Sequence, residues 1–575
     1  GLAGRVECLK FAFAFLVAPW VGSALSLFAE HPALHRTRFS LSTLPLILLV
    51  GLLALPVLAL LASWLPWGVV QADTGAILRE MASTVLPGYV WTTLWLGLWV
   101  AVGAAVVGTA TAAAVTLFEF PGRRVFEWLL LLPLAMPAYV TAYAYTDFLQ
   151  FSGPLQVGLR ETFGLEGRLL PEVRSLWGAI WVFTFSLYPY VYLLARTALG
   201  ERAAHLMEAA RLLGAPLSRR ITSIALPLAR PAVAAGVALA LMETLADFGV
   251  TSYFGIQTFT TGIIKAWLSM DNRIAAAQLS TMLLALVLVL LWLEHRAERR
   301  MRFTAKGTGH AGATEAQPVP LRGLARGLAW GVCTLPVFMG FVAPVAFMLR
   351  PLASDWSVLP WSRFLEWAWN SVRLGGITAG LAVAVALALA FAVRRRPDLL
   401  TRGVVRLASV GYAVPGAVIV VGLLLPVGWV QAHFPHWGVG ALVTTTAVGI
   451  VWAYLVRFCA VALQSVQSGY ARIPASLDDS ARMLGAGSAR LMANVHWPLL
   501  RRSTAAAALL VFVDVMKELP ATMVLRPFNS DTLAVVAYQL ARDERLGEAA
   551  LPSLALVAVG LVPVILLSRT LRGRA

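Results

Sequence analysis

The chain has 575 residues, of which 59% are hydrophobic and only 13% are charged, and its formal net charge is +17. This composition lies outside the usual balance of a soluble domain and favours a membrane protein. The basic residues stand in short loops beside apolar segments and are not grouped with stacking aromatic residues, so the positive charge does not indicate a nucleic-acid-binding protein.

Apolar runs of about 20 residues, long enough for a helix to cross ~30 Å of hydrocarbon, recur along the chain. They lack the alternation of a membrane barrel, so we predict an all-α polytopic membrane protein with about 12 transmembrane helices. The first six spans are expected near residues 44–66, 90–116, 126–147, 176–195, 232–254 and 275–293. The second six are expected near residues 328–349, 371–393, 404–425, 439–461, 503–524 and 551–568.

A polar, low-complexity segment at residues 294–327 separates two apolar halves and is the expected linker between domains. We therefore predict one membrane domain over residues 41–293 and a second over residues 328–575. Residues 1–40 contain a further hydrophobic stretch with basic residues on both sides, so charge does not orient it. Whether that stretch is a span stays open.

The two halves are copies of one another. An offset of 271 positions carries Ala210 onto Ala481 and Gly214 onto Gly485. Both copies fall between the fourth and fifth predicted spans of their half, and therefore on the same side of the membrane. This arrangement predicts two parallel six-helix repeats, related by an axis along the membrane normal.

The repeated loop has the composition of a short helix with a defined end. Its first copy consists of Glu208, Ala209, Ala210, Gly214, Ile224, Leu226 and Pro227. The second copy keeps the spacing with Asp479, Ser480, Ala481, Gly485, Val495, Trp497 and Pro498. Alanine favours the helix, the glycine ends it, and the proline starts the next span.

The first copy matches the EAA motif of ABC import permeases at every defined position, and the second copy is a looser match. The chain therefore resembles the type I ABC importer permeases, which have a MetI-like fold. The resemblance implies that each short helix is a coupling helix that docks in a groove of an ATPase subunit. It gives this role to the motif residues Glu208, Ala209, Ala210, Gly214, Ile224, Leu226, Pro227, Asp479, Ala481, Gly485 and Pro498. The alternative is an ordinary interfacial turn between two spans.

The chain has no GxxxxGK[ST] phosphate-binding loop, so we expect a transport permease and not an enzyme. The resemblance implies that two copies of a separate ABC ATPase subunit hydrolyse the ATP, and that this chain binds no cofactor of its own. It also implies a periplasmic or extracellular substrate-binding protein as a partner, within the cytoplasmic (inner) membrane of a bacterium. Basic runs such as Arg394-Arg395-Arg396 place both ends of the 12-helix core in the cytoplasm.

Four carboxylates repeat at the same offset within predicted spans. Glu243 and Asp247 correspond to Asp514 and Glu518, and the spacing of four residues predicts that each pair shares one helix face. Ionisable groups inside a membrane are by default candidates for the substrate pathway, so we expect these acids to line a central passage and attract a cation. The alternatives are that they cap helix ends, pair with Lys517, or hold the two halves together at a closed gate.

The runs that begin at Leu245 and at Lys517 resemble those of fused two-domain ferric-iron permeases. Ferric ion is a hard cation that prefers oxygen ligands, which suits carboxylates, with Tyr143, Tyr188 and Tyr190 in reserve. No metal ligand is assigned, because the histidines show no metal-ligand spacing. Thiamine, phosphonate and polyamine permeases share the layout and remain alternatives. An ion-coupled secondary transporter is the rival of a different mechanism, since internal repeats and buried acids occur there too.

Overall fold

The computed structural model describes residues 44–64, 74–200, 204–305, 318–354, 356–357, 359–395 and 398–572, and the predicted stretch at residues 1–40 lies outside them. The helices of the first half are α2 (Leu44–Ala62), α3 (Thr74–Ser83), α4 (Leu86–Leu117), α5 (Arg123–Leu129), η2 (Leu132–Ala135), α6 (Ala138–Leu149), α7 (Pro154–Phe163), α8 (Leu176–Ala198), α9 (Ala204–Leu212), α10 (Leu217–Arg220), η4 (Ile221–Ala225), α11 (Leu226–Ala246), α12 (Gly249–Tyr253), α13 (Phe259–Ile264), η5 (Lys265–Ser269) and α14 (Arg273–Ala305).

The helices of the second half are α15 (Leu324–Val337), η6 (Phe338–Val342), α16 (Ala343–Ser354), α17 (Trp361–Arg395), α18 (Leu399–Ser409), η7 (Val410–Ala413), α19 (Gly416–His433), η8 (Pro435–Trp437), α20 (Val439–Thr445), α21 (Ala447–Tyr470), α22 (Ala475–Met483), α23 (Ser488–Arg490), η9 (Leu491–His496), α24 (Trp497–Lys517), α25 (Pro520–Leu525), α26 (Leu533–Arg542) and α27 (Leu546–Arg572). Two short strands, β1 (Phe118–Glu119) and β2 (Val319–Pro320), pair in parallel.

The all-α membrane architecture is confirmed. Within the described residues, ten helical segments are long and apolar enough to span a membrane, and a bent pair could supply an eleventh. These segments are Leu44–Ala62, Leu86–Leu117, Leu176–Ala198, Leu217–Ala246, Arg273–Glu294, Leu324–Ser354, Trp361–Arg395, Gly416–His433, Ala447–Tyr470 and Leu546–Leu566.

Five predicted spans differ from the simple helices expected. The span predicted at residues 232–254 runs past the end of α11 at Ala246. The spans predicted at residues 404–425 and 439–461 each cover parts of two helices, α18 with α19 and α20 with α21. At residues 126–147 the chain forms a pair of helices bent by 88°. The bend lies at Pro137, whose backbone is extended and starts α6. At residues 503–524 the helix α24 ends at Lys517, before Pro520 starts α25. The predicted linker is also partly helical, because α14 continues to Ala305.

The repeat seen in the sequence recurs in the helix bounds. The offset of 271 positions carries the start of α8, Leu176, onto the start of α21, Ala447. It carries both bounds of α9 onto those of α22, and both bounds of α11 onto those of α24. The two halves thus share the part of the fold that includes the motif.

The first helix of each half packs against the other half. In the first half, α2 lies against α18 and α19, and the Trp452 indole on α21 donates to the Leu52 carbonyl at 3.0 Å. In the second half, α15 lies against α4, and the Trp330 indole donates to the Pro121 carbonyl at 2.9 Å. The exchange joins the halves into one helical body.

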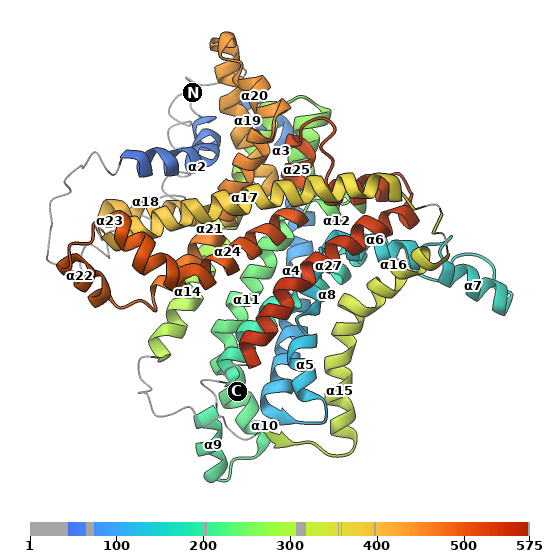
Figure 1. The fold of residues 1–575 in the computed structure, drawn as a ribbon. Helices are drawn as coiled ribbons and strands as arrows, with labels where there is room; N and C mark the ends of the chain where they lie inside the picture. Colours follow the sequence, from blue (N-terminus) through green and yellow to red (C-terminus); the bar gives the residue numbers. More distant parts are fainter. Residues whose placement is uncertain are drawn as a thin grey trace.

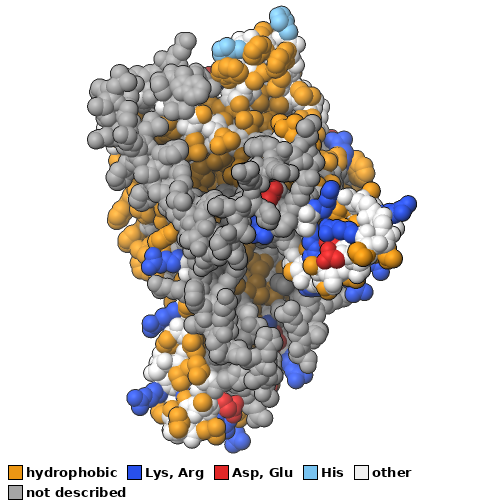
Figure 2. Space-filling view, turned by 90° about the vertical axis from the view of Figure 1, so that its left-hand side faces the viewer, with side chains coloured by type: hydrophobic (Ala, Val, Ile, Leu, Met, Phe, Trp, Pro, Cys, Tyr) orange, Lys and Arg blue, Asp and Glu red, His pale blue; other side chains and the backbone are white. Residues whose placement is uncertain are grey.

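The two motif helices, α9 and α22, lie far from α7 and α20, the short helices in loops on the other side of the molecule. Figure 1 shows α9 at the bottom and α22 at the left, whereas α7 lies at the right and α20 at the top. Exposed arginines accompany the motif helices, among them Arg211, Arg219, Arg472, Arg482 and Arg490. Figure 2 shows the face that lies at the left in Figure 1. On this face the Lys and Arg side chains stand mainly in the lower and right-hand parts, and histidines stand at the upper tip.

Candidate functional site

The motif helices α9 and α22 end in the same backbone turn. Gly214 and Gly485 have φ values of +79° and +78°, in the left-handed region that glycine adopts without strain. The amide of each glycine donates to the carbonyl three residues back, at 3.0 Å to Arg211 and 2.9 Å to Arg482. The following residue donates five residues back at 3.0 Å in both copies, which completes a Schellman motif.

The structure places the other motif residues around these helices and at the start of the next spans. Glu208, Ala209 and Asp479 are exposed, and Ala210 and Ala481 are half-buried. Leu226 starts α11, and the prolines stand in the first turns of α11 and α24, as a proline without an amide hydrogen allows. These two prolines are Pro227 in α11 and Pro498 in α24. The remaining motif residue, Ile224, lies in η4, directly before α11.

Each motif helix presents two large apolar side chains at its end. Leu212 and Leu213 are 84% and 88% exposed, and their counterparts Met483 and Leu484 are 88% and 87% exposed. Exposed arginines beside them lie in water-facing loops, so these side chains are not lipid-facing. Paired apolar residues held outward by a rigid turn are typical of a surface that another protein covers.

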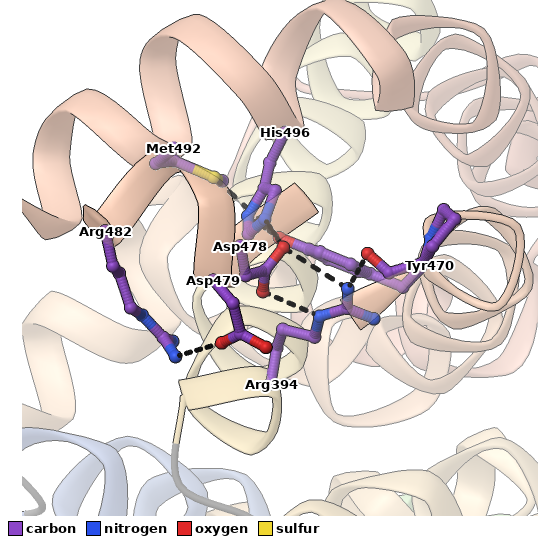
Figure 3. Close-up of polar contacts among 8 residues, drawn as sticks. Arg394, Tyr470, Asp478, Asp479, Arg482, Met492 and His496 are labelled. Atoms are coloured by element: carbon purple, nitrogen blue, oxygen red, sulfur yellow. Dashed lines mark hydrogen bonds and ion pairs between the residues drawn. The ribbon is translucent and has the colours of Figure 1, made fainter. Parts of the chain in front are cut away.

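One acid anchors α22, and it is not the motif acid. Asp478 is buried, and its carboxylate accepts bonds from Arg394 Nε at 2.9 Å and from His496 Nε2 at 3.0 Å. His496 Nδ1 lies 3.2 Å from the Tyr470 hydroxyl. Figure 3 shows Asp478 between His496 and Arg394, while Asp479 points toward Arg482. Burial would raise the pKa of Asp478, but the bonds from Arg394 and His496 lower it below the ordinary value.

The group of four residues, Arg394, Tyr470, Asp478 and His496, is not among the sites predicted from the sequence. In the sequence Arg394 belongs to a basic run, and the other three residues lie on three different helices, α21, α22 and η9. A signal was available, because Asp478 stands where the first copy has Met207, a change from an apolar to an acidic residue at a helix position.

The predicted pathway acids fall into two kinds. Asp247 and Glu518 lie one residue beyond the ends of α11 and α24, with extended backbone, so the expectation that each pair shares one helix face is wrong. Asp247 Oδ1 accepts from the Val250 amide at 2.9 Å, at the start of α12. Glu518 accepts from the amides of Ala521 and Thr522 at 3.1 and 3.0 Å, at the start of α25. Both acids therefore cap helices.

Glu518 also forms the ion pair that its burial requires. Arg457 Nη1 lies 3.4 Å from Glu518 Oε1, and the two side chains are 13% and 1% exposed. A buried carboxylate with a cationic partner and two amide donors is satisfied where it stands. The capping alternative thus describes Asp247 and Glu518.

Glu243 and Asp514 remain within α11 and α24, where they are half-buried near the boundary of the two halves. The Tyr412 hydroxyl, from the second half, donates to Glu243 Oε1 at 3.2 Å. Lys517 Nζ, also from the second half, donates to the Leu134 carbonyl at 3.0 Å. The described residues contain no group of three or more His, Cys, Asp or Glu side chains that could hold a metal ion.

The three tyrosines named with these acids occupy different environments. The Tyr188 hydroxyl donates to the Leu130 carbonyl at 3.0 Å and is fully buried, which makes it a packing residue. Tyr143 is buried, and its hydroxyl has no hydrogen-bond partner within the described residues. Tyr190 is half-buried on α8.

On the side opposite the motif helices, an outer contact of Arg174, Glu544 and Tyr253 joins the halves. Arg174 pairs with Glu544 through two bonds of 2.6 and 2.8 Å, and it donates to the Tyr253 hydroxyl at 3.0 Å. Ser252 and Tyr538 lie beside them with their hydroxyls 2.8 Å apart. The hydrogen bonds from Arg174 lower the pKa of Glu544, which keeps it charged at neutral pH.

Residues 104–303, which include α9 and α11, match the family of binding-protein-dependent transport system inner membrane components. The chain is 27% identical over 484 residues to the Fe(3+)-transport system permease protein FbpB 2 of Haemophilus influenzae, which covers 83% of this chain and 88% of the relative. It is 22% identical to the ferric transport system permease protein FbpB of Actinobacillus pleuropneumoniae, over 93% of this chain and 78% of the relative.

A third relative is a putative 2-aminoethylphosphonate transport system permease protein, PhnU, of Salmonella choleraesuis. It is 25% identical over 40% of this chain and 81% of its own length. The family is one of transport permeases and not of catalytic subunits, and its members work with ATPase and binding-protein partners. The matched segment, the relatives and the helical architecture together make the chain similar to multi-pass inner-membrane permeases of the ABC import class.

Proposed function

We propose that this permease imports ferric iron that a separate periplasmic binding protein delivers. Two relatives that match most of the chain are named as ferric transport permeases. The acids Glu243 and Asp514 at the boundary of the halves supply the oxygen-rich, negative surroundings that a hard cation prefers. The absence of a closed ligand set among the described acids suits a passage that attracts the ion and does not retain it.

The energy for transport comes from ATP hydrolysis by two copies of an ABC ATPase subunit, one docked on α9 and one docked on α22. The single observation that supports this proposal best is the repeated, outward-facing apolar pair, Leu212 with Leu213 and Met483 with Leu484. Both ends of the helical core lie in the cytoplasm under this proposal, together with the motif helices and their exposed arginines. The chain itself binds no cofactor, and ATP is used by the partner subunits.

Reconstitution tests the proposal directly. Vesicles that contain the chain with its ATPase are expected to accumulate radioactive ferric iron only when loaded binding protein is outside and ATP is inside. Omission of the ATPase, or a non-hydrolysable ATP analogue, should remove the uptake. Uptake that persists without the ATPase but follows an imposed ion gradient would support a secondary transporter instead.

A phosphonate is the second candidate substrate, and one observation favours it. Lys517 stands three residues after Asp514 on α24, and Arg457 pairs with Glu518, so two cationic groups lie beside the predicted pathway acids, as an anionic substrate would require. Competition distinguishes the two candidates in the same vesicles. Unlabelled ferric iron should suppress the uptake of labelled iron, whereas 2-aminoethylphosphonate should leave it unchanged.

The outer contact provides a further prediction. Glu544→Gln removes the ion pair to Arg174 between the halves, so the outward-open state becomes easier to reach. We expect ATP hydrolysis without binding protein to rise about two- to five-fold, because an exposed ion pair contributes up to ~1 kcal/mol. The measurement is the ATPase rate of the reconstituted complex.

Glu548→Gln is the matched control, since Glu548 pairs with Arg545 within the second half and does not join the halves. An unchanged rate in Glu544→Gln would contradict a closing role for the outer contact. The lowered pKa of Glu544 gives the pH dependence its sign: the pair contributes above the ordinary glutamate pKa and is lost as the pH falls through the lowered value.

A further inference from the structure

The two motif helices are anchored at the same three positions by opposite kinds of chemistry. In the second half these positions hold Tyr470, Asp478 and His496, all buried. The offset of 271 positions carries them onto Leu199, Met207 and Ala225, which are buried as well. One anchor is therefore polar and the other is apolar, in the same place of the repeat.

The apolar anchor is part of a larger cluster. Leu199, Met207 and Ala225 belong to one group of buried residues, and α9 packs against η4, the segment that leads into α11. The counterpart of Arg394 is Arg123. Within the described residues its polar contacts are with Val115, Glu119 and Glu127, and none of these lies on α9. Contacts of this kind have no preferred direction, so α9 can shift by small steps without leaving a polar group unpaired.

The polar anchor fixes α22 to three spans at once. Arg394 lies in the last turn of α17. It donates to Asp478 and to the carbonyl of Pro474, directly before α22, at 2.9 Å in both cases. Tyr470 ends α21, and His496 is the last residue before α24. Asp478 therefore links the motif helix to the inner ends of α17, α21 and α24.

Directional bonds resist displacement in a way that the apolar anchor does not. The carboxylate of Asp478 is 5% exposed and Arg394 is 20% exposed, so a shift of α22 would leave charges without partners in a water-poor site. The imidazole of His496 is fully buried and uses both of its nitrogens. A hydrogen-bond network that loses some of its partners raises the free energy of the protein. We therefore expect α22 to move together with α17, α21 and α24 as one unit.

We infer that Asp478 is a positioning residue that makes α22 the rigid transmitter of ATPase movement, while α9 is the compliant one. This inference rests on the proposed function, in which both helices dock on ATPase subunits. Movement of the second ATPase is passed directly to α24, whose far end bears Asp514 and Lys517. The two halves then contribute unequally to the opening of the passage, although their motif helices look alike.

The test separates transmission from docking. In the reconstituted full complex, Asp478→Asn is expected to retain ATPase association and ATP hydrolysis, because Met483 and Leu484 are unchanged. The amount of iron moved per ATP hydrolysed is expected to fall about ten-fold, since the guanidinium of Arg394 loses its charged partner and α22 its fixed direction. Arg394→Gln should have the same effect.

Arg395→Gln is the matched control. Arg395 adjoins Arg394 in the same turn, but it is exposed and lies over the Phe391 ring at 5.9 Å. This variant should keep the iron-to-ATP ratio of the unmodified complex. A ratio that falls equally in Arg395→Gln and Arg394→Gln would overturn the inference, because it would reflect general loss of positive charge.

A second variant guards against simple misfolding. The triple change Tyr470→Leu, Asp478→Met and His496→Ala copies the apolar anchor of the first half and leaves no buried acid unpaired. It is expected to assemble and hydrolyse ATP with the same lowered iron-to-ATP ratio. An unchanged ratio in this variant, or a parallel loss of hydrolysis and uptake, would overturn the inference. Failure of ATP-dependent uptake in the unmodified complex would contradict the proposed function instead.

Discussion

Replacing Glu243 with Gln and Asp514 with Asn together is expected to abolish iron uptake while ATP hydrolysis continues. Each acid is half-buried within a span, and neither caps a helix. Two unit charges about 4 Å apart interact by about 4 kcal/mol at an effective dielectric constant near 20, and a trivalent ion experiences more. The passage would therefore lose most of its attraction for the ion, and we expect uptake to fall at least about 100-fold.

The measurement is iron uptake and phosphate release in the same vesicles. Glu161→Gln is the control, because Glu161 is an exposed acid on α7, outside the boundary of the halves. It should leave both rates unchanged. Retained uptake in the double variant would show that the two acids serve packing or closure and do not attract substrate.

The capping acids should respond differently. Asp247→Asn and Glu518→Gln disturb helix starts, and Glu518 also has a cationic partner, so these changes should lower the stability of the protein before they alter selectivity. The prediction of a shared helix face was wrong because α11 and α24 end before Asp247 and Glu518. Two acids four apart share a face only when the helix continues past both. In the second half Pro520 already indicated that it ends.

The motif helices were predictable because their determinants are local. A glycine with positive φ, the residues before it and the spacing to the next proline all lie within one stretch of sequence. The exchange of α2 and α15 between the halves was not predictable, since it depends on which apolar faces meet after folding. Pro137 was a local signal for the bend, but the uniformly apolar composition of residues 126–147 favoured a single straight span.

The polar anchor of α22 illustrates the same limit. Its four side chains come from α17, α21, α22 and η9, so no single window of sequence contains them. The internal repeat is the sequence feature that could have indicated this site, because it aligns Asp478 with Met207 and His496 with Ala225. Positions where one copy of a repeat is apolar and the other is charged indicate that the two copies differ in role.

Removing the apolar pairs of the motif helices is expected to detach the ATPase. Burying a leucine stabilises an interface by about 1.5–3 kcal/mol, so Leu212→Ser with Leu213→Ser should weaken docking by at least about 100-fold. The same holds for Met483→Ser with Leu484→Ser. Copurification, ATP hydrolysis and uptake should be lost together, unlike the separation expected for Asp478→Asn. Leu324→Ser is the control, because Leu324 is 82% exposed at the start of α15, outside both motif helices. Full copurification in both paired variants would contradict docking through these residues.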